Sequence, residues 1–346
     1  MESIMPKVNI LVCYHKAIPL IIGNEILRPI FLGASNANPK IISKLQSLCD
    51  KQKVGKSSVT LWRDDSPIST NTQNNENLTS SIHSFQSPQS PTCPNISTLN
   101  PYFCELTAMY WAWKNLDSDY YGLFHYRRVF DLKFDEKNYK NEPITIPLMS
   151  FKKIEQQFGL EPQLATQTIS KCDIIVSARY KDHHIDSKNN LDYENMCIYE
   201  HYKNAHNISD LDVCINHINE HYPQMRESMQ KTLYTKPVRW SIANMFIMKK
   251  ELYFEYCEWI FDVLFGVQDK IDYKSYDTHA ARVFGFLAER LLNIWVNYKA
   301  QALPQLKITY APIIFTPKYR PKFGFEYDSA YKRLFLFGVR VWKSKL

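Results

Sequence analysis

The sequence predicts an α/β fold, in which helices cover both faces of a mostly parallel sheet. Short apolar runs typical of buried strands alternate along the chain with longer segments of helical periodicity. The chain has 346 residues, of which 45% are hydrophobic and 22% charged, so it can bury a large core. These values are close to globular averages and argue against a disordered or fibrous protein.

The first predicted strand covers residues 7–14, KVNILVCY, a short apolar run of the kind found in buried strands. His15 and Lys16 follow it directly. Because ligands of open α/β folds bind beyond the carboxyl ends of the strands, this pair is placed where a nucleotide could bind. Two solvated residues at the start of a loop would give the same pattern.

The segment 51–100 is rich in Ser, Thr, Asn, Gln and Pro, and Trp62 and Phe85 are its main large apolar residues. This composition predicts a long loop or a partly disordered insertion. Loops of this length often bind ligands in compact enzymes, but a variable insertion without a role fits the composition equally well.

The remaining elements alternate between helix and strand. Residues 105–115, ELTAMYWAWKN, predict a largely buried helix, and residues 120–130, YYGLFHYRRVF, predict a central strand that ends in a basic cluster. Further strands are expected at 172–177 and 241–248, and further helices at 196–204, 211–221, 250–265 and 278–298.

Several common enzyme motifs are missing from the sequence. It contains neither a GxGxxG nor a Walker loop, which argues against dinucleotide dehydrogenases and P-loop kinases. A serine nucleophile elbow and an HExxH motif are also absent, so routine hydrolase functions have no support. The eight cysteines form no CxxC pair, which argues against a disulfide framework or a structural zinc site.

Positive charge is concentrated near the end of the chain. The formal net charge is +7, and residues 299–346 hold ten Lys or Arg against two acids. Residues 331–346, YKRLFLFGVRVWKSKL, combine basic, aliphatic and aromatic side chains, which suits the surface of an anionic membrane. The alternatives are a last strand or helix that packs on the domain, and a nucleic-acid-binding tail, for which no known motif is present.

No secretory signal and no run of about 18 apolar residues is visible in the sequence. We therefore expect the chain to remain in the cytoplasm, where its basic end could contact the inner face of the cytoplasmic membrane.

Four blocks of the sequence carry a resemblance to a known family. They are NPYFCELTAMYWAWKNLDSDYYGLFHYRRVFD at 100–131, YEHY at 199–202, NMFIMKK at 244–250 and GFLAER at 285–290. In this order they resemble the capsular-polysaccharide glycosyltransferases, a bacterial family long catalogued as a domain of unknown function. The resemblance implies a GT-A-like, Rossmann-related domain over residues 1–310, followed by the basic aromatic segment 311–346.

The resemblance also implies an activity. A hexose, which the activities of the resembled family suggest is galactose in its pyranose or furanose form, would be transferred from a UDP-sugar to a lipid-linked oligosaccharide, lipopolysaccharide or capsule acceptor. The alternative is a non-catalytic carbohydrate-binding or polysaccharide-assembly protein on a degenerate transferase fold, because a shared fold does not prove turnover. The expected donor-binding residues are Tyr14, His15, Lys16, His125, Arg127, Arg128, Asn244 and Arg282.

The need for a divalent metal is left open by the sequence. Typical GT-A enzymes hold a cation on the donor diphosphate with an Asp-x-Asp motif, where this chain has HYRR at 125–128. Two guanidinium groups could neutralise a diphosphate themselves, or could form salt bridges only, and strand alternation would direct only one of them to the ligand. Asp131, Asp117 and Asp119 are the remaining candidate metal ligands, unless they are solvated loop residues.

Inverting glycosyl transfer needs a group that takes the proton of the acceptor hydroxyl. The candidates near the GFLAER block are Glu289, Asp277 and His279. Glu289 is the first choice, because GT-A enzymes that the chain resembles often place an acid on a late helix. A surface ion pair of Glu289 with Arg282 or Arg290 is an equally simple explanation of its presence.

Overall fold

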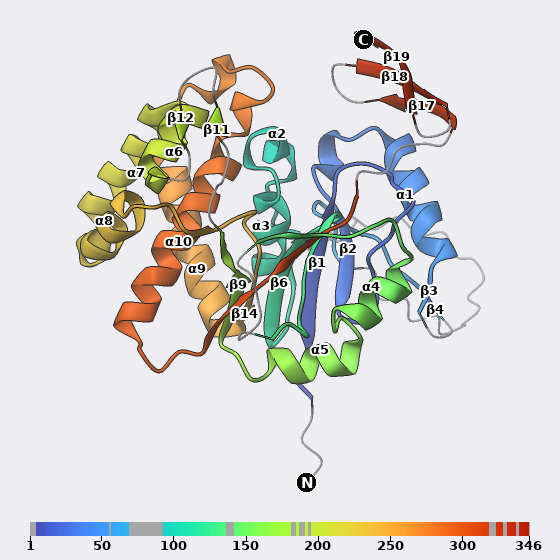
Figure 1. The fold of residues 1–346 in the computed structure, drawn as a ribbon, viewed down its shortest axis with the longest axis horizontal. Coiled ribbons are helices and arrows are strands. Elements are labelled where there is room, and N and C mark those ends of the chain that lie inside the picture. Colours follow the sequence, from blue (N-terminus) through green and yellow to red (C-terminus); the bar gives the residue numbers. More distant parts are fainter. Residues whose placement is uncertain are drawn as a thin grey trace, which may run out of the picture.

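The computed structural model describes residues 5–54, 57–68, 93–135, 142–180, 185–186, 191–192, 195–317, 323–327, 331–336 and 339–345. A central sheet runs through the molecule with helices on both of its faces (Figure 1). The α/β fold class predicted from the sequence is therefore confirmed.

Seven strands form the main row of the sheet, in the order β15-β9-β14-β6-β1-β2-β5. In this row only β14 runs antiparallel to its neighbours β6 and β9. The strands are β1 (Val8–Tyr14), β2 (Leu27–Phe31), β5 (Trp62–Arg63), β6 (Tyr120–His125), β9 (Ile174–Ser177), β14 (Phe246–Lys249) and β15 (Ile308–Ala311).

Shorter strands extend this sheet or pair beside it. Strand β16 pairs with β7 and β8, and separate small sheets are formed by β3 with β4, β10 with β13, β11 with β12, and β17 with β18 and β19. Their bounds are β3 Lys53–Val54, β4 Ser57–Ser58, β7 Arg128–Phe130, β8 Ile144–Thr145, β10 Arg179–Tyr180, β11 Ile185–Asp186, β12 Leu191–Asp192, β13 Trp240–Ser241, β16 Ile313–Phe315, β17 Phe323–Tyr327, β18 Tyr331–Leu336 and β19 Val339–Lys345.

Two hydrophobic cores lie on the two faces of the sheet, and alternate residues of β1 enter them. Leu11 and Cys13 belong to the core built with α3, α7, α9 and α10, whereas Ile10 and Val12 belong to the core built with α1, α4 and α5. The helices are α1 (Pro39–Lys51), α2 (Asn100–Phe103), α3 (Leu106–Asn115), α4 (Phe151–Gln157), α5 (Pro162–Ile169), α6 (Ile198–Ala205), α7 (Ile208–His221), α8 (Arg226–Tyr234), α9 (Lys250–Gln268) and α10 (Val283–Ala302).

Two of the predicted strands are interrupted. The segment 120–130 is not one strand, because the chain reverses after His125 and β7 returns antiparallel to β6. The segment 241–248 is divided into β13 and β14 by a turn in which Ala243 and Asn244 have left-handed backbone angles. Both interruptions lie at the carboxyl-end edge of the sheet, where they place polar groups.

Part of the segment 51–100 also differs from the expected loop. Its Trp62–Arg63 pair forms β5 and closes one edge of the sheet beside β2. Asp64 follows, and residues 69–92 lie outside the described part of the chain. Among the helices that the structure describes, none is both long enough and apolar enough to span a bilayer.

Candidate functional site

Three chain segments meet at the carboxyl-end edge of the sheet. His15 and Lys16 follow β1, and residues 125–128 form the reversal from the end of β6, the parallel neighbour of β1, to the start of β7. Because β14 runs antiparallel, its preceding turn with Ala243 and Asn244 reaches the same edge. This edge is the usual ligand position in an open α/β sheet.

Tyr126 packs the ends of β1 and β6 together. Its ring lies 5.7 Å from the Tyr14 ring and 5.2 Å from the His15 ring, and the Lys16 ammonium lies 5.7 Å from its centre. Tyr14 is fully buried, and its hydroxyl accepts a hydrogen bond from the Ile22 amide at 2.8 Å. Tyr14 therefore supports the edge from inside the core, while His15 and Lys16 reach its surface.

The turn before β14 is strained and held by two side chains. Ala243 and Asn244 have φ angles of 71° and 48°, a region that residues with a Cβ rarely adopt. Glu289 on α10 accepts a hydrogen bond from the Ala243 amide, and His125 Nε2 donates to the Ala243 carbonyl at 2.6 Å. Burial, with the charge of Arg128 as the next cause, lowers the pKa of His125 to about 4, so its imidazole is neutral at pH 7.

Glu105 places a carboxylate at the same carboxyl-end edge of the sheet. It follows Cys104, the third described non-glycine residue with a positive φ, 51°. Glu105 Oε1 accepts from Asn244 Nδ2 at 3.2 Å. Burial raises the pKa of Glu105, opposed by the Asn244 hydrogen bond and by the charges of Arg282 and Arg128. The other amide atom, Asn244 Oδ1, is buried and has no hydrogen-bond partner among the described residues.

Positive charge converges on this edge from three elements. Arg282, just before α10, is exposed, and its Nε donates to Cys104 Sγ at 3.3 Å. Enclosure by the protein and the charges of Lys16 and Arg282 lower the pKa of His15. Arg128, which lies 5.3 Å above the Phe315 ring, acts on both His125 and Glu105. Lys16, Arg128 and Arg282 thus share one electrostatic neighbourhood.

Arg127 has a different environment from Arg128. Its guanidinium donates to the Thr316 carbonyl at 3.3 and 3.2 Å, and the Thr316 amide donates back to the Arg127 carbonyl at 3.0 Å. These bonds tie the reversal after β6 to the end of β16. Of the two arginines, Arg128 is the one whose charge reaches His125 and Glu105.

Glu289 is anchored on its other side by Arg290. Arg290 Nη1 donates to Glu289 Oε2 at 2.8 Å. The Arg290 guanidinium is buried between the Trp240 and Tyr202 rings, 4.4 and 5.1 Å from their centres, which adds cation–π attraction. Tyr202 belongs to the YEHY block, so two of the sequence blocks meet at this point.

The other two predicted catalytic residues lie outside this network. The Asp277 carboxylate accepts from the His279 and Ala280 amides, both at 2.8 Å, and these bonds lower its pKa. His279 is exposed, and its ring lies 5.3 Å from the Phe286 ring. Asp277 therefore caps the turn before α10. His279 and His206 both pack against the Phe286 ring, and the His206 ring lies 4.1 Å from it.

Glu105 and Asp64 are polar site residues that the sequence analysis missed. Asp64 is fully buried and accepts from the Gly33 and Ala34 amides and from the hydroxyls of Ser97 and Thr107. Thr107 lies in the first turn of α3, so Asp64 fixes the helix start next to Glu105. The available signal for Glu105 was a lone acid at the start of an otherwise apolar helix.

The aspartates considered as metal ligands are dispersed. Asp117 pairs with Lys250 at 2.7 Å, and Asp119 accepts from the Lys7 amide at 2.7 Å, both at the amino end of β6. They lie at the opposite edge of the sheet from residues 125–128, so the expectation that they could serve a ligand there is wrong. Asp131 accepts from the Lys133 amide at 2.9 Å. Within the described ranges, no three His, Cys, Asp or Glu side chains are grouped closely enough to hold a metal ion.

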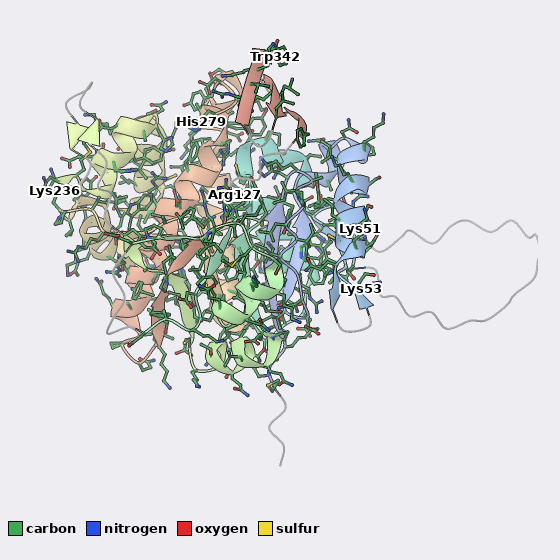
Figure 2. The ribbon with its side chains drawn as sticks, turned by 45° about the vertical axis from the view of Figure 1, so that its right-hand side comes forward. Lys51, Lys53, Arg127, Lys236, His279 and Trp342 are labelled. Atoms are coloured by element: carbon green, nitrogen blue, oxygen red, sulfur yellow. The ribbon has the colours of Figure 1, made fainter. Side chains whose placement is uncertain are left out.

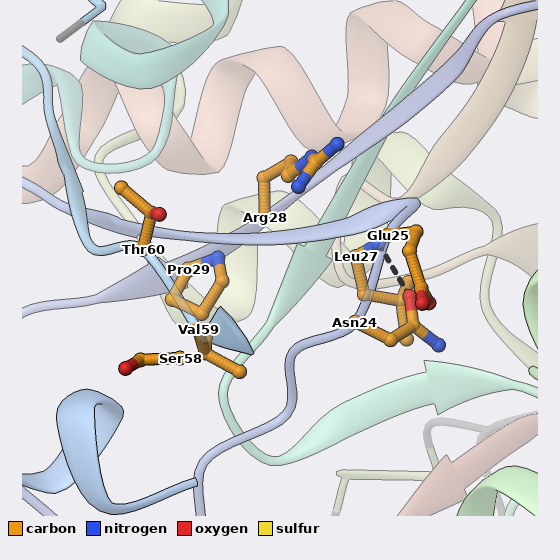
Figure 3. A pocket seen from close by; sticks show the side chains of 8 residues that line it. All are labelled: Asn24, Glu25, Leu27, Arg28, Pro29, Ser58, Val59 and Thr60. Carbon is orange, nitrogen blue, oxygen red and sulfur yellow. Dashed lines mark hydrogen bonds between the residues drawn. The ribbon is translucent and has the colours of Figure 1, made fainter. Parts of the chain in front are cut away.

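A separate hollow of about 280 Å³ lies near the amino end of β2 (Figure 3). It is lined by polar and apolar side chains, among them Asn24, Arg28 and Thr60. Asn24 Nδ2 already donates hydrogen bonds to Glu155 and to the Leu160 carbonyl, and Arg28 Nε donates to Asn9 Oδ1. This hollow is remote from the polar edge formed by Glu105, the 125–128 reversal and the β14 turn.

Comparisons with known proteins agree with this architecture. A solved apo structure of the WbbM bifunctional glycosyltransferase has a TM-score of 0.67 and 22% sequence identity, and the match covers 94% of this chain. The chain spans about half of that protein, 48% of its chain, and at this identity the likeness concerns the fold alone, which is GT-A-like.

No curated protein sequence matches the chain. The family model described as a domain of unknown function, DUF4422, matches residues 66–301, which is more than half of the chain. The chain therefore belongs to the DUF4422 family.

Proposed function

We propose that the protein is a glycosyltransferase that moves a hexose from a UDP-sugar to a lipid-linked oligosaccharide, lipopolysaccharide or capsule acceptor. The observation that carries this proposal is the convergence of Lys16, Arg128 and Arg282 on one edge of a GT-A-like sheet, where Lys16 and Arg282 act on His15, and Arg128 and Arg282 act on the Glu105 carboxylate.

The three cations suit a nucleoside diphosphate. Guanidinium and ammonium groups bind phosphate oxygens through charge-assisted hydrogen bonds, and Arg282 is exposed and available for such a contact. Their charge would also stabilise the diphosphate as it leaves the sugar. His15, beside Lys16 at the end of β1, would line the nucleotide side of this edge.

The polar groups beside the cations suit the hydroxyls of the donor sugar. Asn244 Oδ1 is buried without a partner, and burial of an unsatisfied carbonyl is costly unless a ligand or water donates to it. Glu105 lies next to it and is an acceptor when ionised. A hexose bound here would present hydroxyl donors to both residues.

Glu289 is proposed as the general base. The acceptor oxygen would attack the anomeric carbon, its proton would pass to the carboxylate, and the bond from that carbon to the diphosphate oxygen would break. Arg290 and the Ala243 amide fix the Glu289 carboxyl in position. Asp277 and His279, whose ring packs against Phe286, remain the alternatives.

Galactose and a surface-polysaccharide acceptor are proposed from the resemblance of the sequence blocks. The likeness to a bifunctional glycosyltransferase supports the reaction class at a coarse level. A lipid-linked acceptor would bring the enzyme to the inner face of the cytoplasmic membrane.

Calorimetry with UDP-galactose, UDP-glucose and a guanosine diphosphate sugar tests the donor. We expect heat of binding for a UDP-sugar, also with a chelator present, because protein cations can meet the diphosphate charge. Equal, negligible heats for all donors would overturn the proposal. Donor binding without any transfer to glycan acceptors would favour the non-catalytic, polysaccharide-assembly alternative.

A further inference from the structure

The last three strands form a small antiparallel sheet, β17-β18-β19, with β19 at its edge. We infer that this C-terminal sheet docks the protein on an anionic phospholipid membrane through β19, with Val341 and Trp342 entering the interface and Arg340 and Lys343 contacting lipid phosphates.

Exposed apolar side chains are concentrated in this sheet. Phe323, Leu336, Val341 and Trp342 are 59%, 42%, 52% and 45% exposed, four of the eleven large apolar side chains exposed in the described chain. Exposed apolar side chains concentrated on so few residues are typical of a surface that binds a protein or a membrane rather than of one that contacts only water. Tryptophan is also enriched at membrane interfaces, because its ring is apolar and its N–H is polar.

The strand register divides the apolar and basic side chains. Leu334 lies opposite Trp342, and the adjacent pair is Arg333 opposite Lys343. Since cross-strand partners share a face and successive pairs alternate, the first pair lies on one face and the second on the other. The irregularity after Leu334 leaves Val341 without a cross-strand partner in the register.

Strand β19 presents both kinds of side chain at an exposed edge. Arg340, Val341, Trp342 and Lys343 are consecutive and all exposed. Arg333 and Lys343 lie directly opposite each other, and Glu326 of β17 lies opposite Arg333 on its other side. Long basic side chains can reach phosphates while their neighbours enter the apolar region. This charge pattern fits an anionic membrane rather than an apolar partner.

The position of the β17–β19 sheet determines which part of the molecule would face the membrane after docking. Figure 1 shows β17–β19 at the end of the molecule to which the carboxyl ends of the parallel strands point, opposite the N-terminus. Trp342 remains at this end after the rotation in Figure 2. Docking through β19 would turn the edge with Lys16 and Arg282 toward the membrane, where a lipid-linked acceptor would lie; this last step rests on the proposed function.

The test is cosedimentation of the full chain with vesicles. We expect binding to phosphatidylglycerol–phosphatidylcholine vesicles at least tenfold stronger than to phosphatidylcholine alone, and weaker in high salt. Each basic residue near such a surface contributes about fivefold, so R340E/K343E should lower binding at least twentyfold. W342A should lower it about fivefold to tenfold through lost apolar burial.

The matched control is K51E/K53E, which makes the same change in charge at two exposed lysines away from Trp342 (Figure 2). It should bind vesicles within about twofold of wild type. All variants should keep the wild-type melting temperature and UDP-sugar affinity, so failure of the proposed enzyme function would leave the vesicle result standing.

Equal binding of wild type and R340E/K343E to anionic vesicles would overturn the inference, as would equal binding to neutral vesicles. Self-association in gel filtration that W342A abolishes, without vesicle binding by wild type, would instead assign the β19 edge to a second copy of the chain.

Discussion

Glu289 accepts a hydrogen bond from the backbone amide of Ala243, 46 residues earlier in the chain. This bond joins α10 to the strained turn before β14, and His125 holds the same turn from the opposite side through the Ala243 carbonyl. Residues in a left-handed conformation persist only where their surroundings fix them, and such residues cluster at functional sites. The Ala243–Asn244 turn is therefore part of the candidate site rather than a simple connection.

The backbone of this turn leads to the first prediction. Ala243→Gly should be tolerated, with the melting temperature close to wild type, because glycine adopts a φ of 71° without steric cost. Ala243→Val should lower the free energy of unfolding by about 2 kcal/mol or more, because a β-branched side chain is strongly disfavoured there. Denaturant unfolding of the two variants measures this difference. Equal stability of the Gly and Val variants would show that the turn relaxes freely.

The second prediction separates the two neighbouring arginines. Arg128→Ala should weaken UDP-sugar binding by about 1.5 to 3 kcal/mol, the usual cost of a lost charge-assisted hydrogen bond. Arg128→Lys should restore binding only in part, because an ammonium lacks the planar fork of a guanidinium. Calorimetry with the folded variants provides the measurement.

Arg127→Ala is the matched control for this experiment. Its guanidinium contacts the Thr316 carbonyl, so its loss should reduce stability by about 1 kcal/mol and change donor affinity less than threefold. If both alanine variants bind donor normally, residues 125–128 are structural, and the question of a metal on the donor is open again.

The sequence predicted the strands of the sheet better than the turns at their carboxyl-end edge. Hydrophobic periodicity located β1, β6 and β9, since buried strands need continuous apolar runs. It did not locate the reversal at Tyr126 and Arg127, because neither residue is of a type that usually marks a turn, and it missed the turn at Ala243 and Asn244, where a single Asn within an apolar run was the available signal.

The same limit applies to the site. His15, Lys16 and Arg128 could be proposed from their position after a strand. Glu105 could not, because its partner Asn244 is 139 residues away and only the antiparallel course of β14 brings the two together. The buried Asp64 was missed for a related reason, since its four donors come from three separate segments.

The third prediction concerns pH. The pKa of His125 is about 4 in the native state and about 6.5 in the unfolded chain, so between these values the unfolded state binds more protons. The free energy of unfolding is therefore not reduced by His125 above about pH 6.5, and it falls as the pH decreases from 6.5 toward 4. His125→Gln keeps an N–H donor but cannot titrate, so its free energy of unfolding should fall less steeply over this range. Identical slopes for wild type and variant, measured with denaturant at several pH values, would show that His125 does not titrate in this way.

The last prediction concerns chemistry. Glu289→Gln should leave donor affinity nearly unchanged, because the amide oxygen can still accept from the Ala243 amide, but it should lower the free energy of unfolding, because buried Arg290 loses its carboxylate partner. Transfer to a glycan acceptor should fall about a hundredfold or more, the usual scale for loss of a general base. Glu289→Ala is the informative companion: it removes the acceptor of the Ala243 amide and should also lower the free energy of unfolding by about 1 to 3 kcal/mol. Initial rates with saturating donor and unfolding curves of both variants separate the two roles. A rate for Glu289→Gln within a few-fold of wild type would exclude Glu289 as the base, and Asp277 and His279 would then be tested by the same substitutions.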